Sequence, residues 1–279
     1  MMPYKIDEHI FDKLTPASSW VLGLLITDGN ICKTKSGYRI KLALQRQDRD
    51  VLEKVKAILA AENKIGDYCI SRIAFGKENT YSWSELVIQN YNIATALLNL
   101  GLKPRKSLKE VVPKLIFNSK EEEIVRAFVL GAVEGDGSLY FDSWWSRPTV
   151  SLVGGCKFVR QIAKLIKKFT GVDSFFFKDK RMGKKAYLGL RISKRGAGEA
   201  VLRWLYASSE PHMRMNRKHK KFTEIMNVVD SLNNEPQVKS DPAMRRAGNP
   251  SRPPNQIRQQ TANGRLRQAN SPTLSRKGR

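Results

Sequence analysis

Asp28 and Asp136 each precede a glycine and end two related nine-residue segments of the 279-residue sequence. Residues 21–29 read VLGLLITDG and residues 129–137 read VLGAVEGDG, with five identical positions. If the two carboxylates meet, they repel each other, and a divalent cation bound by their oxygen atoms removes that repulsion. The pair therefore predicts a Mg²⁺ (or Mn²⁺) site. The alternative is that each Asp-Gly is only a turn, and its repetition at matched positions argues against that.

Each segment has the composition of an apolar helix that ends at its Asp-Gly, where the glycine suits a left-handed position. Ser18 or Ser19 can cap the first helix, and Ser119 can cap the second. A carboxylate at a helix C-terminus opposes the helix dipole, so stability alone does not explain the two aspartates. Small residues recur every four positions on both helices, at Ser19, Gly23 and Thr27 and at Ala127, Gly131 and Gly135. Such stripes let two backbones approach closely, so we expect these helices to pair and to bring Asp28 beside Asp136.

The segments downstream of each helix also correspond. In both copies the apolar periodicity predicts a helix, two strands, a helix, two strands and a last helix. The predicted fold class is α+β, with a first repeat over residues 1–115 and a second over residues 116–230. Residues 231–279 carry ten Lys or Arg, two acids and no aromatic residue, which predicts a disordered basic tail.

The sequence has 50 Lys and Arg against 26 Asp and Glu, a formal net charge of +24. Such an excess predicts a nucleic-acid partner, because cationic side chains neutralise phosphates and release counterions. Two carboxylates with bound metal beside a basic surface are typical of phosphodiester hydrolysis.

With these motifs the sequence resembles the LAGLIDADG homing endonucleases in their single-chain form with two motifs. The resemblance covers roughly residues 12–230. It implies two pseudo-symmetric αββαββα repeats that form a saddle of antiparallel sheets over DNA, with the motif helices at the centre. The eighth motif residue is the metal-binding acid, which corresponds to Asp28 and Asp136. At the sixth motif position, where the family has Asp, the first copy has Ile26 and the second has Glu134. The residue at this position is not the principal metal ligand.

The resemblance also implies polar residues after the second strand and a lysine near the last helix. Gln45, Gln47 and Asp48 follow that strand in the first copy, whereas the second copy has Gly-Gly-Cys at residues 154–156. Lys106 and Lys218 are the corresponding lysines, which could orient water or stabilise charge on the phosphorus in the transition state. The alternative for each lysine is an ordinary phosphate contact. We therefore expect Asp28, Asp136, Gln47, Lys106 and Lys218 to act in catalysis.

Alternating strand residues would face the DNA. In the first copy Arg39, Lys41, Ala43 and Gln45 lie opposite an apolar face. Arg and Lys suit guanine and Gln suits adenine, whereas lysines at hairpin tips more often hold phosphates. The further expected DNA contacts are Arg72, Lys77, Arg147, Ser151, Lys178, Lys180, Arg181, Lys184, Lys185 and Arg191.

The resulting hypothesis is a monomeric, site-specific endonuclease that cuts double-stranded DNA and is encoded by a mobile intron. Two alternatives keep the fold: a maturase that binds intron RNA, and a DNA-binding regulator with a degenerate site. A protein that only binds nucleic acid has no reason to keep two carboxylates that repel each other, so their presence favours the enzyme. The sequence shows neither the Cys start nor the terminal His-Asn of a splicing domain, which argues against a self-contained intein. Three cysteines without a CxxC pair favour a reducing intracellular compartment, in the cytoplasm, nucleoid or organellar matrix. No stretch is apolar enough to predict a membrane span.

Overall fold

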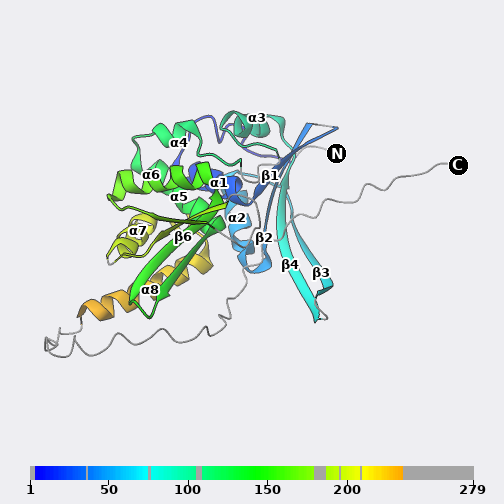
Figure 1. Cartoon of the computed structure of the whole chain (residues 1–279). Helices are drawn as coiled ribbons and strands as arrows, with labels where there is room; N and C mark the ends of the chain where they lie inside the picture. Colours follow the sequence, from blue (N-terminus) through cyan, green and yellow to red (C-terminus); the bar gives the residue numbers. More distant parts are fainter. Residues whose placement is uncertain are drawn as a thin grey trace, which may run out of the picture. The chain divides into compact units, whose positions relative to one another are not determined.

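The same order of elements occurs twice in the computed structural model (Figure 1), as the sequence predicts. The first repeat comprises α1 (Pro16–Thr27), β1 (Gly29–Thr34), β2 (Gly37–Gln45), η1 (Arg46–Asp48), α2 (Arg49–Ile58), β3 (Ile65–Ala74), β4 (Lys77–Ile88) and α3 (Tyr91–Asn99). After α4 (Lys114–Asn118), the second comprises α5 (Glu122–Asp136), β5 (Gly137–Asp142), β6 (Arg147–Gly155), α6 (Cys156–Thr170), β7 (Phe175–Lys178), β8 (Tyr187–Ile192), α7 (Ala197–Tyr206), η3 (Pro211–Met213) and α8 (Asn216–Asn234).

The structure describes residues 4–35, 37–74, 77–104, 109–178, 187–194, 196–207 and 209–234. Residues 231–234 belong to α8, so the second repeat extends four residues beyond its predicted end. The rest of the predicted tail lies outside the described residues.

Each repeat builds one four-stranded antiparallel sheet, and the two sheets have the same strand order. The orders are β1-β2-β4-β3 and β5-β6-β8-β7. Helices α2 and α3 pack on the first sheet, and α6 and α7 pack on the second. The motif helices α1 and α5 lie side by side between the two halves (Figure 1). The predicted fold class is therefore confirmed.

Helix α1 begins earlier than the predicted serine caps. Thr15 is the N-cap, its side chain accepts a hydrogen bond from the Ser18 amide at 3.2 Å, and Pro16 occupies the first turn, where proline is favoured. The Ser18 hydroxyl in turn accepts from the Thr15 amide at 2.9 Å, which completes a capping box. Ser119 does not cap α5 itself, since its hydroxyl accepts from the amide of Glu121, the N-cap residue.

The core runs through both repeats and includes the aromatic residue that leads each motif. Trp20 and Phe128 are fully buried. The three cysteines, Cys32, Cys69 and Cys156, are free. Among the described residues, no helix has both the length and the apolar character that crossing a bilayer requires.

Candidate active site

The backbones of α1 and α5 touch at the glycines of the predicted stripe. A Cβ atom added to Gly23 would overlap the carbonyl oxygen of Phe128, and one added to Gly131 would overlap the carbonyl oxygen of Trp20. Only glycine permits this separation, because the atoms in the way belong to the backbone and have no other rotamer to adopt. The predicted pairing of the two motif helices is confirmed.

This packing brings the two motif aspartates to the same end of the helix pair. Asp28 is the C-cap of α1 and Asp136 is the last residue of α5, and both are half-buried. A Cβ atom on Gly135 would lie 2.5 Å from the Oδ2 atom of Asp28. The Asp28 carboxylate therefore lies against Gly135, the residue before Asp136. A larger residue at position 135 would fill the space that this carboxylate occupies.

The donor set fits a hard divalent cation. Carboxylate oxygens are the ligands that Mg²⁺ prefers in proteins, and two such groups at helix C-termini concentrate negative charge there. In the described part of the chain, no three His, Cys, Asp or Glu side chains gather as a metal cluster. Asp28 and Asp136 would hold the cation, and water and phosphate oxygens would supply the other ligands, as is usual for Mg²⁺.

Lys218, in the first turn of α8, lies under the end of the second motif helix and is 6% exposed. Its Nζ atom donates to the backbone carbonyl oxygens of Val133 at 2.8 Å, Glu134 at 2.5 Å and Gly137 at 2.8 Å. Carbonyls at a helix C-terminus lack partners in the helix, and a cation offsets the negative end of its dipole. Lys218 therefore holds the backbone on both sides of Asp136 in place.

The sequence predicted that Lys218 orients water or stabilises transition-state charge, but its ammonium group is committed to these carbonyls. Burial lowers the pKa of Lys218 to about 8, while Glu134, Asp28 and Asp136 act to raise it. We therefore assign Lys218 as a positioning residue. It still contributes a positive field beside both carboxylates.

Glu134 is a fully buried acid, although in the sequence it stands out only as a departure from the motif. Its carboxylate accepts hydrogen bonds from Trp20 Nε1 at 2.8 Å, the Met215 amide at 2.9 Å and the Tyr206 hydroxyl at 3.3 Å. Burial raises the pKa of Glu134 to about 7, and its hydrogen bonds and the charge of Lys218 oppose that shift. Glu134 thus ties α1, α7 and the start of α8 to α5. An acid inside an apolar helical segment was the signal available in the sequence.

We expect Lys218→Met to destabilise the protein by about 3 kcal/mol, because it leaves buried carbonyls and the buried Glu134 without their cation. Thermal or urea unfolding of the purified variant measures this. Lys220→Met is the control, since Lys220 lies two residues away and is exposed. Equal stability of the two variants would contradict the positioning role.

The polar residues after β2 divide into two roles. Asp48 is 4% exposed and forms a bidentate pair with Arg217 of α8, with both N–O distances at 2.8 Å. Gln47 is exposed, and its amide donates to the Gln45 side chain at 2.6 Å. Asp48 therefore links the two repeats, whereas Gln47 and Gln45 stay near the surface. The second repeat lacks this segment, because α6 follows β6 directly.

The outer face of the first sheet carries the predicted DNA-binding residues. On β2 the burial alternates as predicted, with Arg39 exposed and Lys41 and Gln45 half-buried opposite apolar side chains. The β3–β4 register places Arg72 on this same face. Lys41 is paired there with Glu85 at 3.1 Å, so part of its charge is already compensated.

The second sheet repeats this arrangement with one exception. Arg147, Ser151 and Arg191 share the face opposite the helices, because Ser151 pairs directly with Arg191. Lys178 pairs with Leu188, which is buried on the helix side. Since pairing partners point to the same face, Lys178 does not share the face of Arg191, contrary to the prediction.

Several predicted residues cannot be placed. Lys106, Lys180, Arg181, Lys184 and Lys185 lie outside the described residues, as does the side chain of Lys77.

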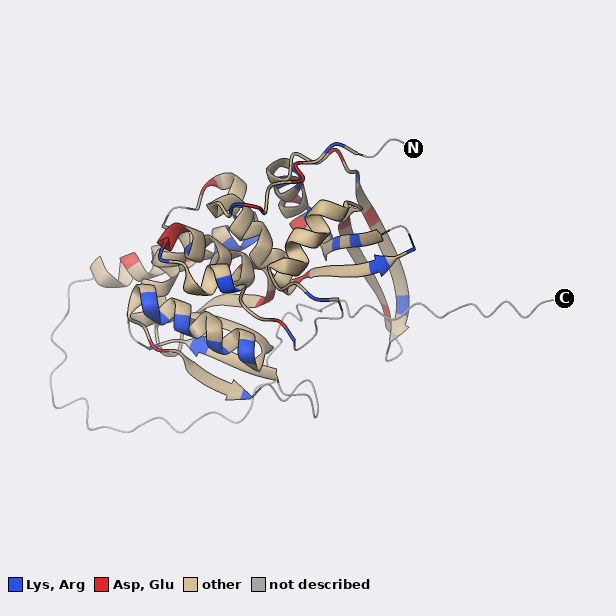
Figure 2. Cartoon of the chain, turned by 90° about the horizontal axis from the view of Figure 1, so that it is seen from above, with Lys and Arg blue, Asp and Glu red and all other residues tan. Residues whose placement is uncertain are grey.

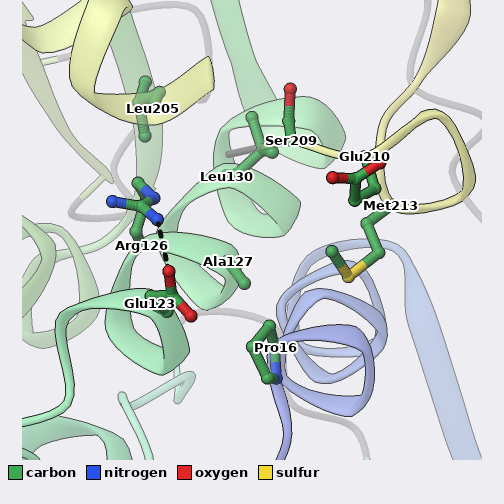
Figure 3. A pocket seen from close by; sticks show the side chains of 9 residues that line it. All are labelled: Pro16, Glu123, Arg126, Ala127, Leu130, Leu205, Ser209, Glu210 and Met213. Carbon is green, nitrogen blue, oxygen red and sulfur yellow. Dashed lines mark ion pairs between the residues drawn. The ribbon is translucent and has the colours of Figure 1, made fainter. Parts of the chain in front are cut away.

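A hollow of about 200 Å³ lies at the opposite end of the helix pair (Figure 3). Pro16 of α1 and Glu123 and Arg126 of α5 line it, and the last two form an ion pair at 3.6 Å. Since α1 spans about 18 Å from Pro16 to its C-terminus, this hollow is separate from the aspartate pair.

No protein-family model and no curated protein matches the sequence. The structure is similar to that of the homing endonuclease I-WcaI bound to its DNA recognition sequence, with a TM-score of 0.52 and 11% identity over 75% of this chain and 87% of that chain. The LAGLIDADG homing endonuclease I-GzeII in complex with its DNA target matches with a TM-score of 0.47 and 12% identity over 81% of this chain and 94% of that chain. The likeness to I-WcaI, together with the repeated order of elements, shows the two-motif fold that the sequence predicted, and it is a likeness of fold alone.

Proposed function

We propose that this chain, which has the two-motif LAGLIDADG endonuclease fold, hydrolyses one phosphodiester bond in each strand of duplex DNA at a specific site. The observation that carries the proposal is that the close-packed helix pair puts the Asp28 carboxylate against Gly135, the residue before Asp136. Half-buried carboxylates that repel each other are unfavourable in a protein that only binds nucleic acid. They favour an enzyme over a regulator or an RNA-binding maturase.

The proposed role of each residue follows from its position in the structure. Asp28 and Asp136 would hold a divalent cation, which supplies Lewis-acid activation of the phosphate and of the attacking water when bound. Lys218 and Glu134 hold the end of α5 in a fixed position against α1 and α8. The outer faces of the two sheets bind the duplex on either side of the cleaved phosphates.

The two sheet faces differ in the groups that they offer to DNA. The first presents Arg39, Gln45 and Arg72, and the second presents Arg147 and Arg191. Arginine reads guanine and glutamine reads adenine in the major groove, so different faces select different half-sites. We therefore propose a long target without two-fold symmetry.

Cleavage is expected to require Mg²⁺ or Mn²⁺. The test is cleavage of a randomised duplex library by the full-length protein with added Mg²⁺ and, separately, with excess chelator. We expect cut products only with the metal, and restoration of cutting when Mg²⁺ exceeds the chelator. Equal cutting under both conditions would contradict the metal requirement while leaving the nuclease assignment intact.

The biological setting is also part of the proposal. One chain supplies both carboxylates, so a monomer is sufficient for cutting both strands. The free cysteines are compatible with a reducing intracellular compartment. We propose that the protein is encoded within a mobile intron and promotes insertion of that intron at its target.

A further inference from the structure

Helix α6 of the second repeat has a continuous basic face. Lys157, Arg160, Lys164 and Lys167 are all exposed, and their spacing of three, four and three residues puts them in one row. The helix contains no acidic residue. Figure 2 shows the row as blue bands along this helix. From the first to the last of these residues the row extends about 15 Å.

The equivalent helix of the first repeat shows that the fold does not require this face. On α2, Arg49 is paired with Glu53, and Lys54 is paired with Asp50 at 3.2 Å. Two of the three basic residues of α2 are therefore paired with acids of the same helix. On α6, Lys167 is paired with Asp173 of the following loop at 2.8 Å, whereas Lys157, Arg160 and Lys164 have no ion pair among the described residues.

A hollow of about 580 Å³ adjoins the basic row, with aromatic side chains in its wall. Phe117 of α4 and Phe176 of β7 line it together with the four cationic residues and one acid, Asp173, whose charge is paired with Lys167. The Arg160 guanidinium lies over the Phe176 ring, 5.3 Å from the centroid. The Ser174 hydroxyl at its edge is buried and has no hydrogen-bond partner. Buried polar groups are nearly always satisfied, so we expect this hydroxyl to take its partner from a bound molecule or from water.

The hollow lies on the other side of the sheet from the proposed DNA-binding face. Phe176 pairs with Leu190, which is buried beneath the helices, whereas the neighbouring Phe175 pairs with Arg191 on the outer face. Successive residues of a strand point to opposite faces. A duplex bound at Arg191 therefore does not occupy the hollow.

We infer that the α6 face and its hollow bind a single-stranded nucleic acid. The cations of α6 would follow successive phosphates, and an unpaired base would stack against Phe117 or Phe176. The Ser174 hydroxyl would bond to the edge of the base or to the sugar. A duplex keeps its bases stacked on one another, so only a single strand can place a base in the hollow. This second site goes beyond the proposed cleavage of DNA and does not depend on it.

The first test uses fluorescence anisotropy of labelled twelve-nucleotide oligo(U) and oligo(dT) with the full-length protein over a range of salt concentrations. The variant Arg160→Gln/Lys164→Gln should flatten the log–log salt dependence by about 1.4, since each phosphate contact on a single strand contributes about 0.7. The control Lys5→Gln/Lys56→Gln removes the same charge at residues outside the hollow. Equal slopes for these two variants would overturn the proposal, because the binding would then be nonspecific.

The second test separates stacking from charge. Phe117→Leu keeps much of the apolar volume but removes the ring, and we expect about fivefold weaker binding or more with an unchanged salt slope. A 2-aminopurine base in the oligonucleotide should be quenched by the wild type and not by this variant. Unchanged affinity and quenching would show that no base enters the hollow. Tighter binding of oligo(U) than of oligo(dT), abolished in Ser174→Ala, would place the sugar hydroxyl at Ser174, whereas an equal loss of affinity for both in this variant would place the base there.

The third test asks whether the two sites are separate. A cleavable target duplex, in excess and with Ca²⁺ in place of Mg²⁺, should leave the labelled oligonucleotide bound. The α6 variants should retain duplex cleavage at the rate of the wild type. Displacement of the oligonucleotide by the duplex would assign both to one surface and overturn the inference. Failure of cleavage in the wild type would contradict the proposed function alone.

Discussion

Asp28→Asn and Asp136→Asn are each expected to abolish double-strand cleavage while leaving affinity for the target nearly unchanged. The amide has the shape of the carboxylate but lacks the negative charge that binds a divalent cation. A loss of about a thousandfold in rate corresponds to about 4 kcal/mol of transition-state stabilisation, a reasonable expectation for removal of one of two protein ligands. The fold should persist, because the charge removed is unfavourable at a helix C-terminus.

The measurement is single-turnover cleavage of a supercoiled plasmid that carries the target, together with a binding titration in the absence of cleavage. Asp12→Asn is the control, since Asp12 is exposed in the segment before α1. A variant at either motif aspartate that linearises the plasmid at the rate of the wild type would show that this aspartate is only a turn residue.

The two variants should differ in residual nicking. The first repeat has Gln45 at the end of β2 and Gln47 just after it, whereas the second repeat passes from Gly155 directly into α6. Unequal polar surroundings make the two strand cuts unequal in rate. Equal amounts of nicked plasmid from both variants would contradict this asymmetry.

Gly131→Ala is expected to destabilise the whole fold by about 2 kcal/mol or more. Alanine is favoured over glycine in a helix by about 1 kcal/mol, so propensity alone predicts the opposite sign. The added Cβ atom, however, would overlap the Trp20 carbonyl oxygen and approach the Leu24 amide nitrogen to 3.2 Å. These are backbone atoms, so α1 and α5 must move apart, and overpacking of this kind costs about 1–3 kcal/mol beyond the lost propensity gain.

Gly154→Ala is the matched control, because a Cβ atom there would make ordinary contacts of 3.5 Å with Phe158 and Val159. Urea unfolding should show a loss for Gly131→Ala and little change for Gly154→Ala. Gly23→Ala should behave as Gly131→Ala does, since its Cβ atom would overlap the Phe128 carbonyl oxygen. Unchanged midpoints for both helix variants would mean that the two motif helices do not meet at these residues in solution.

The sequence by itself determined the architecture and the central pair of carboxylates. The repeat with Asp28 and Asp136 at matched positions, together with the glycine stripe, predicted which helices pair and that both aspartates lie at the same end of that pair. The alternation on β2 predicted that Arg39 and Lys41 lie opposite a buried face. These inferences succeeded because the periods of helices and strands are local and can be counted along the chain.

Only the tertiary structure decided the roles of the polar residues around that pair. In the sequence Lys218 is a candidate catalytic lysine and Glu134 is a departure from the motif, yet in the structure both are buried and hold the end of α5. Asp48 joins Arg217 across a separation of 169 residues, and Lys178 falls on the helix side because of its register with β8. Burial and cross-strand register depend on which distant segments pack together, and the types of the individual residues do not encode that packing.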